Sequence, residues 1–582
     1  MNAETKKCAN CQSEFIIEPD DFSYYQKIGV LPPKMCPPCR AQRRLAFRNE
    51  RSFYKRPCDK CKKEVVSMYS PNKPDTVWCH DCWFADDWDP KDYGLNYDSE
   101  KPFFEQFKKL WEVIPKVSLI HIRNINSEYL NISADSKDCY MIIESSSNEN
   151  CVHCYWIQVC KDLVDVSFSH QTQLSYESDD CYNCYKLFYS KGCHDSRESY
   201  FMLDCKNCSN CIGCVNLRSK QYHIFNQPFS KEEYENFLKS AHLDTHSGVQ
   251  KLREEFEKFM AMQPRKFAEN VNATNSTGNY IKNAKNCRRC FHAYEAEDCA
   301  YSVHVWRDAK DCMDCDTSGR QSELIYNSTN TGLVGSNCIC CSLCWGNNFL
   351  TYCLYCYDSN NCFGSVGLRK QKYCILNKQY EEKEYHELKN KIINDMKAAG
   401  EYGDYYPPAL SAFGYNEACV QDQFPLTKEE ALQQGFKWED SPRGTFGKET
   451  IQWKNIPDSI NEINNLDIPK QIFACALCAK NYLIIQREME FYKQLQIPLP
   501  RLCPDCRHER RFKARGPNRL WHRKCECMKL TDDNKLTTNN KYQNTATHSH
   551  GENPCPNEFE TSYAPDRSEI VYCESCYNSE VL

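Results

Sequence analysis

Cysteines that recur at every third residue are the feature that most constrains this chain. Between residues 139 and 214, all eleven cysteines are separated by multiples of three, and no charged residue occupies that phase from 127 to 217. A period of three fits neither an α-helix, at about 3.6 residues per turn, nor a flat strand, at about 2. It predicts a tight β-solenoid in which every third side chain points into a narrow core of small residues.

The spacing between cysteines suggests the size of one coil. Cys139 and Cys151 lie twelve residues apart, as do Cys193 and Cys205. This periodicity is similar to the twelve-residue solenoid of some small ice-binding proteins. The similarity is limited to periodicity because this chain has no regular threonine ladder, and no ice binding is inferred. A wider right-handed β-helix is the competing architecture.

The cysteine-rich pattern occurs twice. CIGCVNLRSKQYHIFNQPFSKEEYENF at 211–237 matches CFGSVGLRKQKYCILNKQYEEKEYHEL at 362–388, and the cysteines of the second copy keep the three-residue phase with slips. The stretch DCKNCSNCIGCVN also resembles an iron–sulfur ligand run. However, two of its four cysteines become Ser359 and Ser365 in the second copy, which favours core packing. His223 aligns with Cys374, and this pair keeps a metal along the solenoid as the minor alternative.

Paired CxxC motifs at both ends of the chain are typical of zinc modules. Twenty-four residues separate CANC from CPPC at the N-terminal end, and the same number separates CALC from CPDC at the C-terminal end. Each end continues with a second unit, but the C-terminal one begins with CEC, so His522 or Cys555 could replace one of its thiols. Four thiolates form a closed tetrahedral site with a structural role. We predict about four zinc ions per chain, held by Cys8, Cys11, Cys36, Cys39, Cys58, Cys61, Cys79, Cys82, Cys475, Cys478, Cys503, Cys506, Cys525, Cys527, Cys573 and Cys576.

A basic run with interspersed aromatic residues separates the two zinc units at each end. Arginine can fork onto phosphates, and aromatic rings can stack on exposed bases. Two simpler interpretations are a solvated helix face and docking onto the acidic middle of the same chain, residues 83–470, which have a net charge of −13. The candidate nucleic-acid contacts are Arg40, Arg43, Arg44, Arg48, Arg51, Arg507, Arg510, Arg511, Arg515, Arg519 and Trp521.

These patterns predict a mostly β protein with short helices, in which a duplicated cysteine-rich solenoid is flanked by tandem treble-clef zinc modules. The expected order is a zinc module at 1–90, a helical linker at 91–128, solenoid copy 1 with a capping helix at 129–238, a helical linker at 239–283, solenoid copy 2 with a capping helix at 284–398, a linker at 399–470 and a zinc module at 471–582.

Four longer pieces resemble one known family. FYKQLQIPLPRLCPDCRHERR, SMYSPNKPDTVWCHDCW, CIGCVNLRSKQYHIFNQPFSKEEY and FPLTKEEALQQGFKW are similar to segments of large cysteine-rich zinc-binding proteins from candidate-phyla bacteria. The resemblance covers nearly the whole chain. It implies zinc modules combined with repeats, and it implies no activity.

The sequence favours a non-enzymatic function. It contains no phosphate-binding glycine loop, nucleophile elbow or His-Glu metalloprotease helix. A chain with 42 cysteines and no apolar leader-like or membrane-spanning run is expected in a reducing cytoplasm. The leading hypothesis is a zinc-stabilised nucleic-acid-binding protein, with RNA favoured. The alternatives are a protein-interaction scaffold, with the arginines on an acidic protein surface, and an iron–sulfur or other metal-dependent redox enzyme; the oligomeric state is left open.

Overall fold

Two compact units make up the structure, a computed structural model that describes residues 2–441, 444–463, 466–530, 536–538, 542–551 and 553–582. Unit 1 combines Met1–Ser118, Ala268–Ser441 and Asn518–Leu520. Unit 2 combines Leu119–Phe267, Pro442–Pro517 and Trp521–Leu582. Each unit therefore joins one terminal module to the cysteine-rich repeat that is more distant from it in the sequence.

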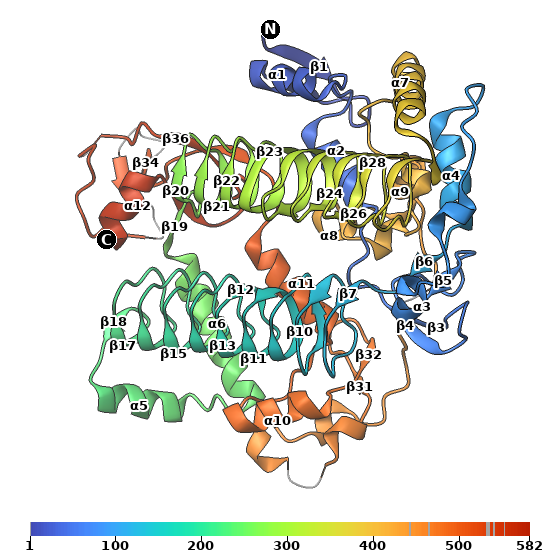
Figure 1. The fold of residues 1–582 in the computed structure, drawn as a ribbon. Coiled ribbons are helices and arrows are strands. Elements are labelled where there is room, and N and C mark those ends of the chain that lie inside the picture. The colour runs from blue at the N-terminus through green and yellow to red at the C-terminus, as the bar shows by residue number, and fades with distance from the viewer. Residues whose placement is uncertain (1, 442–443, 464–465, 531–535, 539–541, 552) are drawn as a thin grey trace. The chain divides into compact units, whose positions relative to one another are not determined.

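Successive parallel strands form a stack of coils in unit 2, named coil stack 1 (residues 121–228). The coils follow one another along the stack (Figure 1). Tyr140 pairs with Val152, and Cys151 with Leu163, so the register advances by twelve residues per coil. The antiparallel strand β18 closes one end. The strands are β7 (His121–Ile122), β8 (Ser133–Ala134), β9 (Tyr140–Ile143), β10 (Glu149–Gln158), β11 (Lys161–Val164), β12 (Ser167–His170), β13 (Gln173–Tyr176), β14 (Tyr185–Phe188), β15 (Arg197–Tyr200), β16 (Ser209–Ile212), β17 (Gln221–Ile224) and β18 (Gln227–Pro228).

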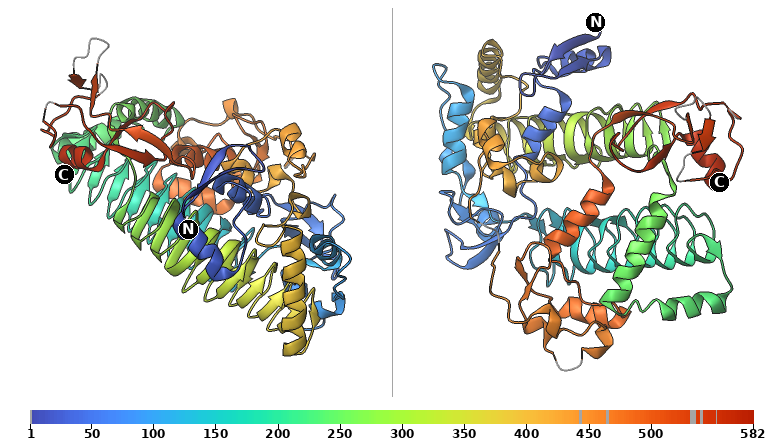
Figure 2. Two further views of the ribbon diagram at one scale, coloured as in Figure 1. Left: turned by 90° about the horizontal axis from the view of Figure 1, so that it is seen from above. Right: turned by 180° about the vertical axis from the view of Figure 1, so that it is seen from behind.

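A second stack of parallel coils lies in unit 1, named coil stack 2 (residues 271–379; Figure 2). Most of its coils also contain twelve residues, but Lys310 pairs with Glu323 and Glu323 with Ser336, a step of thirteen. These longer coils account for the phase slips of its cysteines. The strands are β20 (Val271–Thr274), β21 (Gly278–Lys285), β22 (Cys290–Glu297), β23 (Val303–Gly319), β24 (Glu323–Gly332), β25 (Ser336–Ile339), β26 (Ser342–Trp345), β27 (Asn348–Thr351), β28 (Asn360–Phe363), β29 (Lys372–Ile375) and β30 (Lys378–Gln379).

The inward phase predicted from the cysteines forms the core of coil stack 1. Cys181, Cys193, Cys205 and Cys211 are all fully buried, together with leucines of the same phase such as Leu187. The narrow interior leaves room only for small or slender side chains at these positions.

A second three-residue phase, which the sequence analysis missed, sets the backbone of coil stack 1. Every third residue from Arg123 to Phe225 has a positive φ, the left-handed conformation. Asn and Asp tolerate this region better than most residues do. Their side chains also form bonds between neighbouring coils, as from Asn150 Nδ2 to Asp162 Oδ1 at 2.6 Å and from Asn183 Nδ2 to Asp195 Oδ1 at 2.6 Å.

Helices flank each stack within its own unit. Capping boxes at Ser230–Glu233 and Thr427–Glu430 each begin one of these helices. In unit 1, Phe103 packs edge-to-face against Phe363 of the stack. The helices outside the zinc modules are α4 (Phe103–Val113), α5 (Lys231–Ser240), α6 (His246–Ala261), α7 (Glu382–Ala398), α8 (Val420–Gln423) and α9 (Lys428–Gln433), with short 3₁₀ turns η1 (Pro90–Tyr93), η2 (Pro408–Leu410), η3 (Tyr415–Glu417), η4 (Trp453–Asn455), η5 (Ile460–Glu462) and η6 (Ile468–Lys470).

The terminal modules consist of short hairpins followed by helices. In unit 1 they contain β1 (Glu4–Lys7), β2 (Glu14–Ile17), α1 (Pro19–Ile28), α2 (Pro37–Leu45), β3 (Tyr54–Pro57), β4 (Glu64–Ser67), β5 (Val77–Trp78), α3 (His80–Phe84) and β6 (Lys116–Val117). In unit 2 they contain β31 (Phe473–Ala474), β32 (Asn481–Tyr482), α10 (Gln486–Leu495), α11 (Pro504–Arg515), β33 (Trp521–Lys524), β34 (Met528–Leu530), β35 (Leu536–Thr538), β36 (Glu558–Thr561), β37 (Ile570–Tyr572), which pairs with β19 (Pro264–Lys266), and α12 (Glu574–Val581). Across the described part of the chain, no helix has both the length and the apolar character needed to cross a bilayer.

Candidate metal centres

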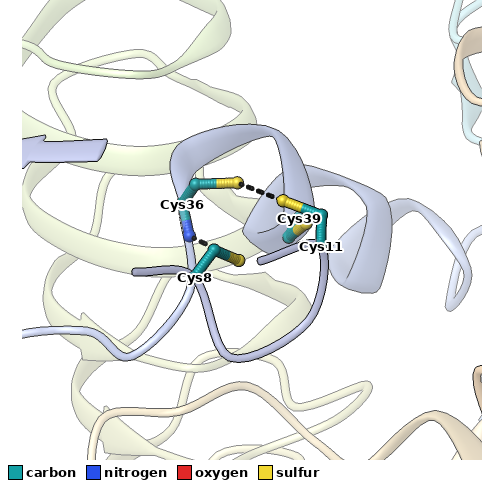
Figure 3. Close-up of side chains that lie close together, drawn as sticks. All are labelled: Cys8, Cys11, Cys36 and Cys39. Carbon is teal, nitrogen blue, oxygen red and sulfur yellow. Dashed lines mark hydrogen bonds between the residues drawn. The ribbon is translucent and has the colours of Figure 1, made fainter. Parts of the chain in front are cut away.

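Three clusters of four cysteines have the geometry of tetrahedral metal sites. In each, the four sulfur atoms lie within 4.8 Å of one another. The Cys11 and Cys36 sulfurs are 3.7 Å apart (Figure 3), those of Cys61 and Cys79 3.8 Å, and those of Cys478 and Cys503 3.7 Å. A tetrahedral zinc ion with Zn–S bonds of about 2.3 Å would separate its sulfurs by about 3.8 Å. The clusters are Cys8–Cys11–Cys36–Cys39, Cys58–Cys61–Cys79–Cys82 and Cys475–Cys478–Cys503–Cys506.

All three clusters share one local construction, in which the third cysteine caps a helix. Cys36 begins α2, Cys79 begins α3 and Cys503 begins α11. The backbone N–H of this cysteine donates to the sulfur of the first cysteine, at 3.3, 3.2 and 3.2 Å in the three clusters. A helix N-terminus and backbone donors both favour a thiolate.

The pKa values of the first cysteines agree with this arrangement. Burial opposes ionisation, but backbone N–H groups of Cys61 and Cys79 outweigh it and lower the pKa of Cys58 to about 6. In the same way, the backbone of Cys503 and Cys478 lowers the pKa of Cys475 to about 7. Thiolates are the ligand form of cysteine, so the first cysteine of each of these two clusters is prepared to bind a cation.

The fourth cluster differs from the predicted set of Cys525, Cys527, Cys573 and Cys576. Cys573 caps α12, and its N–H donates to the Cys525 sulfur at 3.2 Å, as in the other clusters. The four thiols that lie within 4.8 Å of one another are those of Cys525, Cys527, Cys555 and Cys576, so Cys555 stands in the group in place of Cys573. The Cys555 sulfur lies 3.9 Å from that of Cys573 and 3.7 Å from that of Cys576. Of the two alternatives considered from the sequence, Cys555 is therefore in the cluster. His522 lies elsewhere, because its exposed ring pairs with Glu558 at 2.8 Å.

The cysteines of DCKNCSNCIGCVN are core residues of coil stack 1. The Cys205 thiol donates to the Leu203 carbonyl at 3.4 Å, and the Cys211 thiol to the Ser209 carbonyl at 3.3 Å. The Ser359 hydroxyl makes the matching bond to the Tyr357 carbonyl at 3.0 Å in coil stack 2. Serine thus substitutes for cysteine here because both donate to the coil's own backbone. Within the described residues, neither His223 nor Cys374 belongs to a group of metal-ligating side chains.

The arginines of the N-terminal module are directed at coil stack 2, within unit 1. Helix α2 packs on β23 and β24. Arg40 Nε donates to Asp314 Oδ2 at 2.9 Å, and Arg44 Nε donates to Asp316 Oδ2 at 2.8 Å. All four side chains are at most 3% exposed. This is the docking onto the acidic middle that the sequence analysis weighed as an alternative.

The arginines of the C-terminal module repeat this arrangement on coil stack 1, within unit 2. Arg507 and Arg511 both pair with Asp165, at 3.0 and 3.2 Å. Arg507 stands four residues after the helix-capping cysteine, as Arg40 does, and Arg511 stands eight after it, as Arg44 does. Arg44 also lies 3.4 Å from Asp314, so each stack contributes one aspartate that two arginines share. The two interfaces are therefore duplicates.

The other predicted nucleic-acid contacts vary in exposure. Arg48 and Arg515 are buried, and Arg515 lies 3.5 Å from Asp179. Arg510 is half-buried and pairs with Glu177 at 2.5 Å. A phosphate could reach the buried arginines only by displacing their carboxylates. Half-buried or exposed positions are held by Arg43, Arg51, Arg519 and Trp521.

The carboxylates that complete these interfaces are not among the site residues predicted from the sequence. Asp165 and Asp314 face equivalent arginines, and they occupy the left-handed phase of their stacks. A comparison of the two repeats for acidic residues outside the cysteine phase would have found both.

No protein-family model and no curated protein matches this chain. Among solved structures, it is similar to a "putative acetyltransferase" from Desulfovibrio desulfuricans G20, with 10% sequence identity over 42% of this chain and 66% of that chain. The TM-score is 0.10, so this likeness supports no statement about fold or activity.

Proposed function

We propose that the protein is a non-enzymatic scaffold, a duplicated β-solenoid stabilised at both ends by zinc. The observation that carries this proposal is the pairing of buried arginines with Asp314 and Asp165. The basic runs are used to attach each terminal module to a coil stack, and the outer faces of the stacks remain as surfaces for protein partners. Zinc is the metal that four thiolates favour, and reduced cysteines suit a cytoplasmic location.

Nucleic-acid binding is the second candidate, because Arg519 is exposed and Arg43 is half-buried beside the paired arginines. The two functions differ in what the purified protein retains. For a scaffold we expect no nucleic-acid absorbance, and we expect partners from a cell extract to stay bound after ribonuclease treatment.

Filter binding with mixed-sequence RNA tests the choice directly. An affinity that falls steeply with salt, and that falls further in the Arg43→Ala/Arg519→Ala variant, would overturn the scaffold proposal in favour of phosphate contacts. The Lys383→Ala variant, which removes an exposed cation of α7, is the control for a general loss of positive charge.

The redox alternative is tested by metal analysis of protein purified without oxygen. We expect no iron and no loss of metal in the Cys205→Ser/Cys208→Ser variant, since serine makes the same backbone bond in the second copy. The matched Cys36→Ser variant should lose one metal ion per chain. Iron that disappears with Cys205 and Cys208 would make the protein a redox candidate.

A further inference from the structure

Two histidines, His548 and His550, adjoin the fourth cysteine cluster. Cys527, His548, His550 and Cys576 each place a ligand atom within 4.8 Å of the others. Cys527 and Cys576 also belong to the fourth group, with Cys525 and Cys555, and the Cys573 sulfur lies 3.9 Å from that of Cys555. Seven donors thus gather in one place, where a single tetrahedral ion would use four.

His548 is oriented as metal-binding histidines are. Its side chain is 2% exposed, and Nε2 lies 2.8 Å from the buried Glu580 carboxylate. Nδ1 is buried and has no hydrogen-bond partner among the described residues. A carboxylate that holds one ring nitrogen, with the other nitrogen left for the ion, is the usual support of a zinc-bound histidine. Without an ion, this buried nitrogen would be an unsatisfied polar atom.

Glu580 is itself held in place. The backbone N–H of Thr545 and its hydroxyl both donate to Glu580 Oε2, each at 2.8 Å, and the Tyr542 hydroxyl donates to it at 3.0 Å. The orientation of His548 is therefore fixed by a network whose other members take no part in the cluster.

His550 points its free nitrogen at the two remaining thiols. Nδ1 donates to the Asn553 carbonyl at 2.7 Å, which leaves Nε2 as the acceptor. Nε2 lies 3.4 Å from the Cys527 sulfur and 3.5 Å from that of Cys576. Around one zinc ion with Zn–N bonds of about 2.0 Å and Zn–S bonds of about 2.3 Å, these separations would be about 3.5 Å.

We infer that this module is a two-metal centre in which Cys576 bridges the ions. The first ion takes Cys525, Cys555, Cys573 and Cys576, in the construction that the other three clusters share. The second takes Cys527, His548, His550 and Cys576, a set of two sulfurs and two nitrogens that suits zinc. Seven donors with one shared thiolate fill eight coordination positions. The chain then binds five zinc ions, whatever its cellular function.

Metal counting on the full-length protein tests the second ion. By native mass spectrometry, the His548→Ala/His550→Ala variant should carry one zinc fewer than the wild type. The His522→Ala variant, which removes an exposed histidine of the same module, should lose none. An unchanged count in the double variant would overturn the proposal.

Cadmium substitution covers the case in which the double variant loses its fold. In the wild-type protein loaded with ¹¹³Cd, we expect five resonances, two of which show scalar coupling through the shared sulfur. Four resonances would disprove the second ion, and five without coupling would disprove the bridge. The Glu580→Gln variant keeps every ligand, and its second ion should go to a chelator about 10–100-fold more readily.

Discussion

At the scale of residues, a few buried carboxylates each pair with more than one arginine and so attach a terminal module to a coil stack. Asp165 is fully buried and lies within 3.2 Å of both Arg507 and Arg511. Such a buried ion pair need not add much to the free energy of unfolding, because the cost of desolvating both charged groups offsets the attraction between them. Removing one partner is costly, however, because the charges left behind stay buried and unpaired.

The Asp165→Asn variant should therefore destabilise unit 2 by about 3–5 kcal/mol. The free energy of unfolding from urea titration, with hydrogen exchange along α11 as the local measure, checks this. The Asp135→Asn variant is the control, since Asp135 pairs with Arg123 at the surface, and it should change little. Equal effects in the two variants would contradict a structural role for the buried pair.

Glu177 should make stability depend on pH. Burial opposes its ionisation, but Arg510 and Arg253 outweigh this and lower its pKa to about 2, from an ordinary 4.5. A lowered folded-state pKa stabilises the protein above pH 4.5, and the contribution, at most about 3 kcal/mol, is lost as the pH falls towards 2. Urea midpoints between pH 5 and pH 3 should fall less in Glu177→Gln than in the wild type. Glu149→Gln, at a surface position, should behave like the wild type.

At the scale of elements, the coil stacks show what a periodic sequence can and cannot predict. The phase of the cysteines predicts which side chains face inward, because burial acts on every third residue alike. In the sequence, the thirteen-residue coils of coil stack 2 appear only as changes in the three-residue phase of the cysteines. One extra residue in a coil shifts that phase without changing the composition. The left-handed phase was overlooked because it is defined by backbone conformation, which residues as different as Asn, Tyr and Leu all adopt here.

The left-handed positions can be tested at Asn207, which is exposed and has a φ of 54°. Its amide bonds to Ser219 on the next coil, and both Asn207→Val and Asn207→Gly remove that bond. Only the valine must hold a side chain in the left-handed region, which costs about 1–2 kcal/mol. The valine variant should therefore be less stable than the glycine variant by this amount in urea unfolding. Equal stabilities would show that the backbone relaxes.

At the scale of the whole molecule, the decisive feature is which module is joined to which stack. CxxC spacing was enough to predict three clusters and most of the fourth, because a metal site is local in sequence. Which terminal module packs on which coil stack was not predicted, because this depends on ion pairs between residues that lie far apart in sequence. Arg44 and Asp316 are separated by 272 positions.

Hydrogen exchange in the full-length protein tests this pairing. The Arg44→Ala variant leaves Asp314 and Asp316 buried without one of their arginines, so β23 and β24 should exchange faster. The strands of coil stack 1, though closer to Arg44 in sequence, should keep the wild-type rate. Arg43→Ala, a half-buried neighbour on α2, should alter neither stack. Faster exchange throughout stack 1 would contradict the two units.

This pairing also has a consequence for biosynthesis. A ribosome that adds about 5–20 residues per second needs about 14–54 s to travel from Arg44 to Asp316. During that interval the N-terminal module has left the ribosome while the strands that will cover its arginines do not yet exist. All eight cysteines of its two clusters lie within the first 82 residues, so the clusters can keep the module folded before coil stack 2 has been synthesised. Zinc supply during translation would then determine how much of the nascent chain reaches the native state.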